Sequence, residues 1–264
     1  MNQSLIVIKI GTNVLTTNRY QLDLNQLRNI VTQITQCKND SQYHVVLVTS
    51  GAITCGSEHL GYPAETLEQK QAAASVGQIL LMKEYGQFFM QEGLSIAQIL
   101  LTKDGLTDDL RRHNAKKTIM TLLEQGIIPI INENDSVATD EIPTSDNDYF
   151  GDNDLLSSKV AQLIDASKLI MLTDIDGLYS SNPKSSDEAV LIPELSEITD
   201  DIFTYVNDPS HHISRGGMKS KLLAAKSASE MGIDVHIVNG LNSRIIQNLL
   251  EGETHGTYIK GQKS

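Results

Sequence analysis

Four polar segments in the sequence combine residue types that suit anion binding, and each lies at the end of a short apolar run. They are Lys9-Ile10-Gly11-Thr12, Thr49-Ser50-Gly51-Ala52, Asn132-Glu133-Asn134-Asp135 and Thr173-Asp174. Glycine adopts backbone conformations closed to other residues, so Gly11 and Gly51 let backbone N–H groups come close to an anion. Lys9 suits contact with a bound anion. Without a ligand, Lys9 would have to reach the surface or pair with an acid, because an unpaired lysine is rarely buried. The four segments therefore predict a site for an anionic ligand.

A fifth polar segment, before a predicted helix over Leu222–Met231, suits a polyphosphate. It reads Ser214-Arg215-Gly216-Gly217-Met218-Lys219-Ser220-Lys221. Paired glycines offer backbone donors, and the helix dipole and two mobile cations attract negative charge to the same place. The alternative is a basic helix start with a solvated face. Lysine is unfavourable at a helix N-terminus, so a bound anion would explain its presence there.

The acidic segment Gly151-Asp152-Asn153-Asp154 lies directly before an amphipathic helix. Taken alone, Asp154 is interpreted as an ordinary N-cap. The two candidate phosphate-binding lysines, Lys9 and Lys221, need an acid to hold them, and this favours a functional role for Asp154.

The elements that would position these residues form an α/β pattern. Six apolar runs, rich in Ile, Val and Leu without alternation, predict strands buried on both faces: Leu5–Ile10, Val45–Thr49, Ile96–Leu101, Ile127–Asn132, Leu169–Thr173 and Val235–Val238. Helical spacing of apolar residues separates most of them, as over Leu24–Ile34 and Leu156–Leu163. Strands alternating with helices predict a mostly parallel sheet covered on both faces. Ligands of such sheets bind beyond the carboxyl ends of the strands, so the polar segments are expected to share one site.

Composition narrows the class of protein. The chain has 264 residues, of which 40% are hydrophobic and 20% charged, and this composition predicts one globular domain, which can comprise two lobes. Its net charge of −12 argues against binding to nucleic acid or an anionic membrane. The two cysteines, Cys37 and Cys55, are interpreted as reduced thiols in a cytoplasmic protein. No signal peptide and no membrane span are predicted.

Several sequence segments resemble known binding motifs but lack a residue that the motif requires. Gly51-x4-Gly56 lacks the lysine of a Walker A loop, and no G-x-G-x-x-G follows the first strand. Asp146-Asn147-Asp148 resembles an EF-hand start, but Phe150 cannot be a ligand. His211-His212 lacks a spaced third ligand, so no protein-held metal site is expected.

Six segments together resemble the glutamate 5-kinase branch of the amino acid kinase family, in order and spacing, across essentially the whole chain. They are Lys9-x-Gly11, Ser50-Gly51-Ala52, Asn132-Glu133-Asn134-Asp135, Gly151-Asp152-Asn153-Asp154, Thr173-Asp174-x-x-Gly177-Leu178-Tyr179 and Gly216-Gly217-Met218-x-x-Lys221. No single segment is specific for this family, but six segments in this order are. The Asn-Glu-Asn-Asp and Gly-Asp-Asn-Asp pair is similar to glutamate 5-kinases rather than to N-acetylglutamate or uridylate kinases.

The resemblance implies an α/β fold, a three-layer αβα sandwich formed by one domain over residues 1–264. A lobe over about residues 1–165 would bind the amino acid, and a lobe over about residues 166–264 would bind ATP. The implied reaction is ATP-dependent phosphorylation of the γ-carboxylate of L-glutamate, the first step of proline biosynthesis, with Mg²⁺ bound mostly through the nucleotide. A homo-oligomer, dimer or tetramer, and inhibition by proline are also implied.

The resemblance also implies roles for individual residues. The catalytic residues would be Lys9, Lys221 and Asp154, with Asp154 orienting the lysines. Glutamate would contact Ser50, Gly51, Asp135 and Asn153. ATP would contact Lys9, Gly11, Thr173, Asp174, Arg215, Gly216, Gly217, Met218, Lys219, Ser220 and Lys221. Charge alone suggests Asp135 for the α-ammonium and Asn153 or backbone N–H groups for the α-carboxylate.

The chain departs from the family pattern in three places. Thr49 stands where members commonly carry a second serine, and Ser214-Arg215 stands where they carry Gly-Thr. The chain ends at Ser264, so the C-terminal PUA domain of many bacterial members is expected to be absent.

Two alternatives remain open from the sequence. The chain could be another amino acid kinase, with N-acetylglutamate or a different acceptor. It could also be a catalytically silent regulator that binds a nucleotide or an amino acid. The presence of Lys9, Lys221 and Asp154 argues against a silent regulator, which has no need of the transfer lysines.

Overall fold

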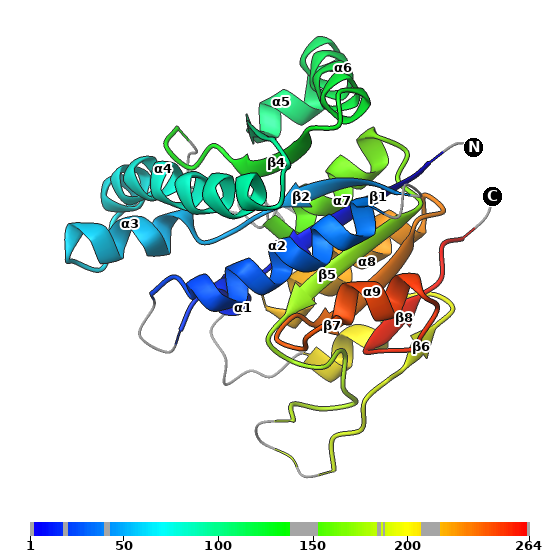
Figure 1. The fold of residues 1–264 in the computed structure, drawn as a ribbon. Helices are drawn as coiled ribbons and strands as arrows, with labels where there is room; N and C mark the ends of the chain where they lie inside the picture. The colour runs from blue at the N-terminus through cyan, green and yellow to red at the C-terminus, as the bar shows by residue number, and fades with distance from the viewer. Residues whose placement is uncertain are drawn as a thin grey trace.

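An eight-stranded, mainly parallel sheet forms the centre of the part of the chain that the structure describes (Figure 1). This computed structural model describes residues 3–17, 21–39, 43–137, 153–183, 186, 188–206 and 217–262. The strands are β1 (Ser4–Ile10), β2 (Tyr43–Val48), β3 (Ile96–Leu101), β4 (Ile128–Glu133), β5 (Lys168–Thr173), β6 (Glu194–Leu195), β7 (Asp234–Asn239) and β8 (Thr257–Ile259). Their order is β3-β4-β2-β1-β5-β7-β8-β6, and every pair is parallel except β7 with β8.

All six strands predicted from apolar runs are confirmed, with bounds that shift by at most two residues. The other two strands, β6 and β8, have two and three residues, too few to stand out as apolar runs. The antiparallel pairing of β8 with β7 is likewise not predicted, because periodicity reports burial and says nothing about strand direction.

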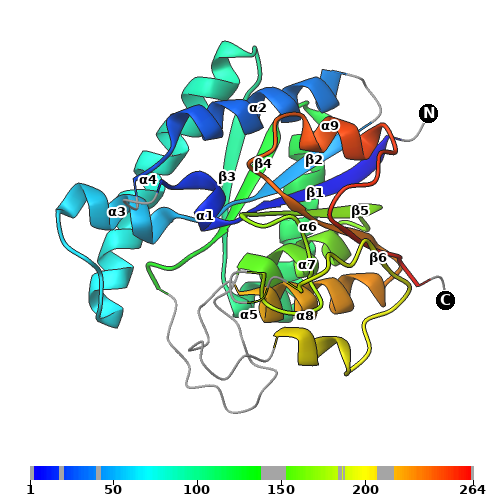
Figure 2. The same cartoon turned by 90° about the horizontal axis from the view of Figure 1, so that it is seen from below.

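Helices cover both faces of the sheet and complete the predicted three-layer αβα architecture (Figure 2). The helices are α1 (Thr12–Leu15), α2 (Leu24–Asn39), α3 (Ala52–Leu60), α4 (Leu67–Gln91), α5 (Lys103–Thr107), α6 (Asp109–Glu124), α7 (Asn153–Leu163), η1 (Ile202–Val206), α8 (Met218–Ser229) and α9 (Ile245–Leu250). Helices α2, α4 and α9 pack on one face, and α6, α7 and α8 pack on the other. No helix in the described part of the chain is both long and apolar enough to span a bilayer.

Strand β1 shows how this architecture directs a polar side chain into a site. Ile6 and Ile8 belong to the cluster under α2, α4 and α9, whereas Val7 belongs to the cluster under α7 and α8. Successive side chains of a strand point to opposite faces, so Lys9 lies on the same face as Val7. Lys9 therefore faces α7 and α8 at the carboxyl end of the sheet.

Candidate active site

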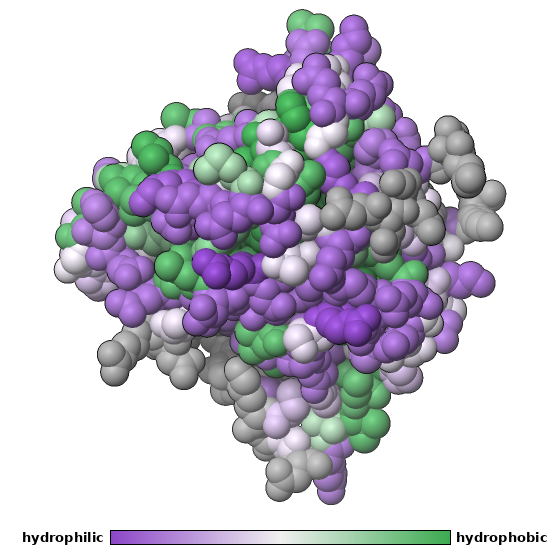
Figure 3. Space-filling model, in the orientation of Figure 1, coloured by the Kyte–Doolittle hydropathy of each residue, from purple (hydrophilic) through white to green (hydrophobic). Residues whose placement is uncertain are grey.

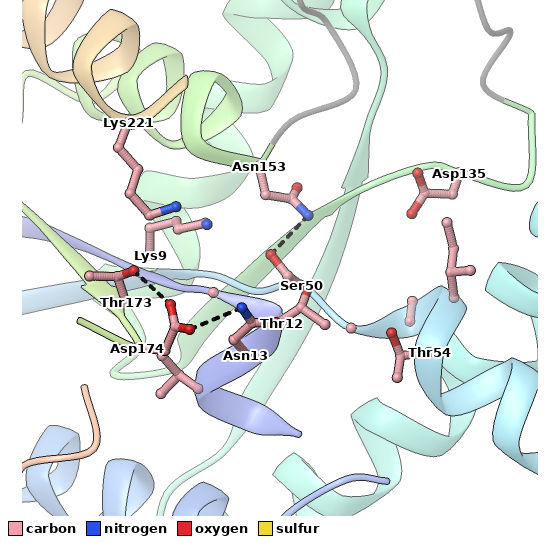
Figure 4. A pocket seen from close by; sticks show the side chains of 15 residues that line it. Lys9, Thr12, Asn13, Ser50, Thr54, Asp135, Asn153, Thr173, Asp174 and Lys221 are labelled. Carbon is pink, nitrogen blue, oxygen red and sulfur yellow. Dashed lines mark hydrogen bonds between the residues drawn. The ribbon is translucent and has the colours of Figure 1, made fainter. Parts of the chain in front are cut away.

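The four predicted strand-end segments meet in one pocket. Strands β4, β2, β1 and β5 are neighbours in the sheet and end on the same edge. A cavity of about 240 Å³ lies at this edge, and its lining includes residues that follow each of the four strands (Figure 4). The lining residues are Lys9, Gly11, Thr12, Asn13, Val14, Ser50, Gly51, Ala52, Ile53, Thr54, Asp135, Asn153, Thr173, Asp174 and Lys221.

Three buried charged side chains lie together beside this cavity. Lys9 is 3% exposed, Asp154 is 0% exposed and Lys221 is 4% exposed. Lys9 Nζ is 2.6 Å from Asp154 Oδ1, and Lys221 Nζ donates to Asp154 Oδ2 at 3.1 Å. The hydroxyl of Ser220 also donates to Asp154 Oδ2, at 2.8 Å. Asp154 therefore holds both lysines, as the sequence hypothesis required of an acid.

The electrostatics of this triad leave a positive charge for a ligand. Burial by itself would raise the pKa of Asp154, but the charges of Lys9 and Lys221, with hydrogen bonds from Lys9 and Ser220, hold that pKa below its usual value. The carboxylate therefore stays ionised near neutral pH. Two ammonium groups and one carboxylate sum to one positive charge. Lys9 and Lys221 lie next to each other at the cavity, where an anionic group can meet both (Figure 4).

Two helix N-termini add to the positive potential at this point. Asp154 lies in the first turn of α7, and Lys221 lies in the first turn of α8. The unpaired backbone N–H groups of a helix start and its dipole attract negative charge. Asp154 is favourably placed in such a field. Lys221 is not, so a bound anion would relieve the positive charge that collects there.

One side of the cavity carries side chains for a small polar ligand. Asn153 Nδ2 donates to Ser50 Oγ at 3.2 Å, whereas Asn153 Oδ1 is buried with no hydrogen-bond partner among the described residues. Asp135 lies farther along the same side (Figure 4). Gly51 has φ 97°, and a Cβ there would meet nothing within 4 Å, so backbone conformation rather than space favours glycine. Gly51 is the N-cap of α3, so the unpaired N–H groups of the first turn of α3 follow directly after the end of β2.

The other side of the cavity is built from β5 and α1. The hydroxyl of Thr173 donates to Asp174 Oδ1 at 3.3 Å, and Asn13 Nδ2 donates to Asp174 Oδ2 at 3.1 Å. A Cβ on Gly11 would lie 3.1 Å from the Leu172 carbonyl oxygen, so the chain runs tightly between β1 and β5. The two lysines lie between this side and the Ser50 side (Figure 4).

Comparison of the sequence with known proteins identifies the family of this chain. The family model described as "Amino acid kinase family" matches residues 4–239. The chain belongs to the amino acid kinase family.

Within this family, the chain is similar to several curated glutamate 5-kinases. It is 43% identical to glutamate 5-kinase 1 of Bacillus subtilis (strain 168) over 98% of this chain and 70% of that protein. It is 44% identical to the glutamate 5-kinase of Moorella thermoacetica over 96% of this chain and 65% of that protein. It is 40% identical to the glutamate 5-kinase of Clostridium tetani over 98% of this chain and 95% of that protein.

Solved structures share the fold of this family member at lower sequence identity. An isopentenyl phosphate kinase matches with a TM-score of 0.66 and 20% identity, over 97% of this chain and 100% of that chain. UMP kinase from Ureaplasma parvum matches with a TM-score of 0.66 and 18% identity, over 98% of this chain and 100% of that chain. Likeness at this identity supports the three-layer fold.

Not all of the predicted site residues line the cavity of this amino acid kinase. Gly217, Met218 and Lys219 lie at the start of α8, beside Lys221, and are not among the lining residues. Ser220 contacts Asp154 instead of the cavity. Arg215, Gly216, Gly151, Asp152 and the His211-His212 pair lie outside the described residues.

Four lining residues belong to short helices and were not predicted: Asn13, Val14, Ile53 and Thr54. Helix α1 has only four residues, too few for an apolar period to reveal it. A polar residue directly after a glycine turn at a strand end is the signal that could have singled out Asn13.

The described residues contain no metal cluster, and the cysteine of the neighbouring α3 is not activated. No group of three or more His, Cys, Asp or Glu side chains among them could hold a metal ion. Burial raises the pKa of Cys55 to about 11, so this thiol is neutral near neutral pH. The polar groups at the cavity instead suit the binding and orientation of charged substrates.

Proposed function

We propose that this chain transfers the γ-phosphoryl group of ATP to the γ-carboxylate of L-glutamate and produces L-glutamyl 5-phosphate, the first step of proline biosynthesis. The observation that carries the proposal is the buried Lys9–Asp154–Lys221 triad between a carboxamide- and carboxylate-lined side and a Thr173-Asp174 side. Relatives at 40–44% identity over nearly the whole chain are glutamate 5-kinases.

The chemistry of the reaction suits a site without a general base. A carboxylate acceptor is already ionised near neutral pH, so no proton has to be removed from it. One carboxylate oxygen forms a bond to the γ-phosphorus while the bond to the oxygen of the β-phosphate breaks, and ADP leaves with the electron pair. Two anions have to meet, and charge builds on the leaving oxygen. Positioning and electrostatic stabilisation are therefore the main requirements.

We assign Lys9 and Lys221 to the transferring phosphoryl group. Both are almost fully buried, and in a site of low dielectric their attraction for the phosphoryl oxygens is stronger than in water. Asp154 fixes both ammonium groups before the substrate arrives, so little reorganisation is needed during transfer. The N–H groups that begin α8 add donors beside Lys221.

We assign the Ser50 side of the cavity, and the lobe up to about residue 165, to L-glutamate. Asp135 offers a negative charge to the α-ammonium group. Asn153 Oδ1 is a buried acceptor without a partner among the described residues, so it also suits the ammonium group. This assignment differs from the sequence hypothesis, in which Asn153 meets the α-carboxylate. The first N–H groups of α3, after Gly51, then suit that carboxylate.

We assign the Thr173-Asp174 side, and the lobe from about residue 166, to ATP with its Mg²⁺. The excess positive charge of the triad and the N-terminus of α8 fit a polyphosphate. Mg²⁺ held through the nucleotide oxygens would supply further charge neutralisation. The Gly217 to Lys221 segment would hold the phosphate chain from the side of α8.

Trapping the acyl phosphate tests this function. The purified chain is incubated with ATP, Mg²⁺, L-glutamate and hydroxylamine, beside parallel reactions with N-acetylglutamate and L-aspartate. We expect hydroxamate with L-glutamate and little with the other two acceptors. Hydroxamate with N-acetylglutamate instead would retain the fold and mechanism but change the acceptor. No hydroxamate with any acceptor, together with measurable ATP binding, would favour a silent regulator.

Replacing Asp135 with asparagine is expected to raise the KM for L-glutamate by roughly 10- to 100-fold, because the α-ammonium group loses its charged partner. The KM for ATP is expected to change little, since Asp135 follows β4 on the side away from Thr173. The measurement is a steady-state titration of both substrates. An unchanged KM for L-glutamate would place the ammonium group elsewhere.

We also propose a homo-oligomer. Strand β3 is the last strand at one end of the described sheet, so one of its backbone edges is unpaired. The neighbouring α4 exposes Ile79 to 72% and Met90 to 70%, and a spacing of eleven residues puts both on one side of the helix. Hydrophobic residues are visible at the α3–α4 end of the molecule (Figure 3). A second copy would cover this apolar face.

Light scattering after size-exclusion chromatography tests the oligomer. The wild-type chain is expected to elute with a multiple of the monomer mass, and Ile79→Lys is expected to shift it toward the monomer. Glu92→Lys, near the end of the same helix, is the control for the added charge. A monomeric wild-type chain would contradict the proposal.

Inhibition by L-proline and a cytoplasmic location are proposed from the family resemblance alone. The hydroxamate assay with added L-proline tests the inhibition.

A further inference from the structure

Helix α4 contributes no residue to the cavity lining, yet its buried face contacts both segments that carry the predicted glutamate ligands. One segment follows β2 and leads to Ser50, and the other ends β4 and leads to Asp135. Three residues of α4 make these contacts: Gly77, Gln78 and Tyr85. The function proposed above gives no role to any of them.

Gln78 connects α4 to the end of β4. Its Oε1 accepts a hydrogen bond of 2.8 Å from Asn132 Nδ2, and Gln78 and Asn132 are 7% and 1% exposed. Asn132 Oδ1 in turn accepts from the backbone N–H of Glu133 at 3.0 Å. Both ends of the Asn132 amide are therefore fixed three residues before Asp135.

The hydrogen bond to Asn132 is the feature that a glutamine adds at this position. Gln78 Nε2 is buried and has no hydrogen-bond partner among the described residues. An unpaired buried donor is unfavourable, by about 1–3 kcal/mol. An apolar side chain of the same size would fill the space without that cost. What it could not do is hold Asn132, and through it the Asp135 turn.

Tyr85 connects α4 to the end of β2. Its hydroxyl is 2.9 Å from Thr49 Oγ1, and both residues are fully buried. Thr49 Oγ1 donates to the Ser50 carbonyl oxygen at 3.3 Å, so Tyr85 supplies the proton of the first hydrogen bond. Burial raises the pKa of Tyr85, which keeps the hydroxyl protonated. A relay of two hydrogen bonds thus runs from α4 to the backbone of Ser50.

Gly77 lets α4 lie directly against the start of α3. A Cβ on Gly77 would be 1.8 Å from the Ala52 carbonyl oxygen and 2.4 Å from the Gly56 backbone nitrogen. A Cβ on Gly56 would similarly be 1.8 Å from the Ala73 carbonyl oxygen. The two helix backbones are therefore in contact, which fixes the position of the N–H groups that begin α3.

We propose that Gln78 and Tyr85 are positioning residues of the amino-acid subsite, and that α4 sets the distance between the two segments that carry Ser50 and Asp135. This inference rests on the function proposed above. The subsite has to bind both ends of a small, flexible molecule at the same time, so a shift of a fraction of an ångström in either segment weakens binding. One rigid helix that holds both segments keeps their separation constant.

The test uses two variants that remove a hydrogen bond and keep the volume. Gln78→Met removes the acceptor for Asn132, and Tyr85→Phe removes only the hydroxyl. Each is expected to raise the KM for L-glutamate roughly tenfold, as the loss of one supporting hydrogen bond would predict, while the KM for ATP stays within about twofold. The calorimetric Kd for L-glutamate is expected to rise in parallel. In the double variant the increases should multiply, because the two residues hold different segments.

Matched controls separate positioning from stability. Gln87→Met makes the same replacement on an exposed part of α4, and Tyr62→Phe makes the other replacement before α4 begins. Both controls are expected to retain wild-type kinetics. If Gln78→Met and Tyr85→Phe lower the thermal midpoint but leave the KM and Kd for L-glutamate unchanged, the residues are only structural and the inference is wrong.

Failure of the proposed function gives a different result. If the wild-type chain phosphorylates another acceptor, the KM for that acceptor replaces the KM for L-glutamate in the comparison. If the wild-type chain phosphorylates no acceptor, the calorimetric Kd for L-glutamate is the only measurement that tests the positioning role of Gln78 and Tyr85. For a chain that phosphorylates no acceptor, an equal Kd in the wild type and the two variants, or no L-glutamate binding by the wild type, overturns the inference.

Discussion

Replacing Lys221 with methionine is expected to lower kcat roughly 10²- to 10³-fold, the usual effect of removing one group that stabilises charge in a transition state. The KM for L-glutamate should change little, because Asp154 holds Lys221 on the side of α8. The residues proposed to contact L-glutamate follow β2 and β4 or begin α7. The variant should fold, since Lys9 remains to neutralise the Asp154 carboxylate at 2.6 Å. Steady-state hydroxamate formation is the measurement.

Lys226→Met is the control for this prediction. It removes the same charge from the same helix, but Lys226 pairs with Asp200 at the surface, at 3.7 Å. Its kcat is expected to match that of the wild type. A normal kcat in Lys221→Met with a raised KM for ATP would reduce Lys221 to a nucleotide-binding residue and remove it from the transfer step.

Replacing Asp154 with asparagine should have the largest effect on stability. Two buried ammonium groups, on Lys9 and Lys221, would lose their shared counter-charge, and breaking a buried ion pair in this way costs about 3–5 kcal/mol. Activity should fall as well, because both lysines lose their orientation. The measurement is the urea midpoint at pH 7 beside the kcat of the folded fraction. Asp165→Asn is the control, since the Asp165–Lys116 ion pair is exposed and should contribute little.

The pH dependence of stability provides a second readout for Asp154. The pKa of Asp154 is lower in the folded chain than in the unfolded chain, so its contribution is fully present above the unfolded value of about 3.9. That contribution is lost as the pH falls through the folded pKa. The wild-type urea midpoint should therefore fall more steeply below about pH 4 than that of Asp154→Asn. Parallel curves would show that the carboxylate adds no net stability.

The sequence by itself determined which segments are strands and that their polar ends share one cavity. Val45–Val48, for example, is apolar at every position because both faces of the sheet are covered. Burial on two faces is a local property that composition reveals. Polar residues directly after such runs have to lie at one edge of a parallel sheet. This rule predicts that Lys9, Ser50, Asp135 and Thr173 share one site, and all four line the same cavity.

Only the tertiary structure decided which of these residues touch. Asp154 is 145 residues from Lys9 and 67 residues from Lys221, and no periodicity links residues at such separations. The need of two lysines for an acid, together with the family resemblance, predicted the triad, whereas the folded chain supplied its distances and burial. The sequence predicts no role for Gln78 and Tyr85, since a buried polar residue on an apolar helix face has no sequence pattern that distinguishes it. Their partners, Asn132 and Thr49, come from two other strand ends, and packing of α4 across those ends creates the contacts.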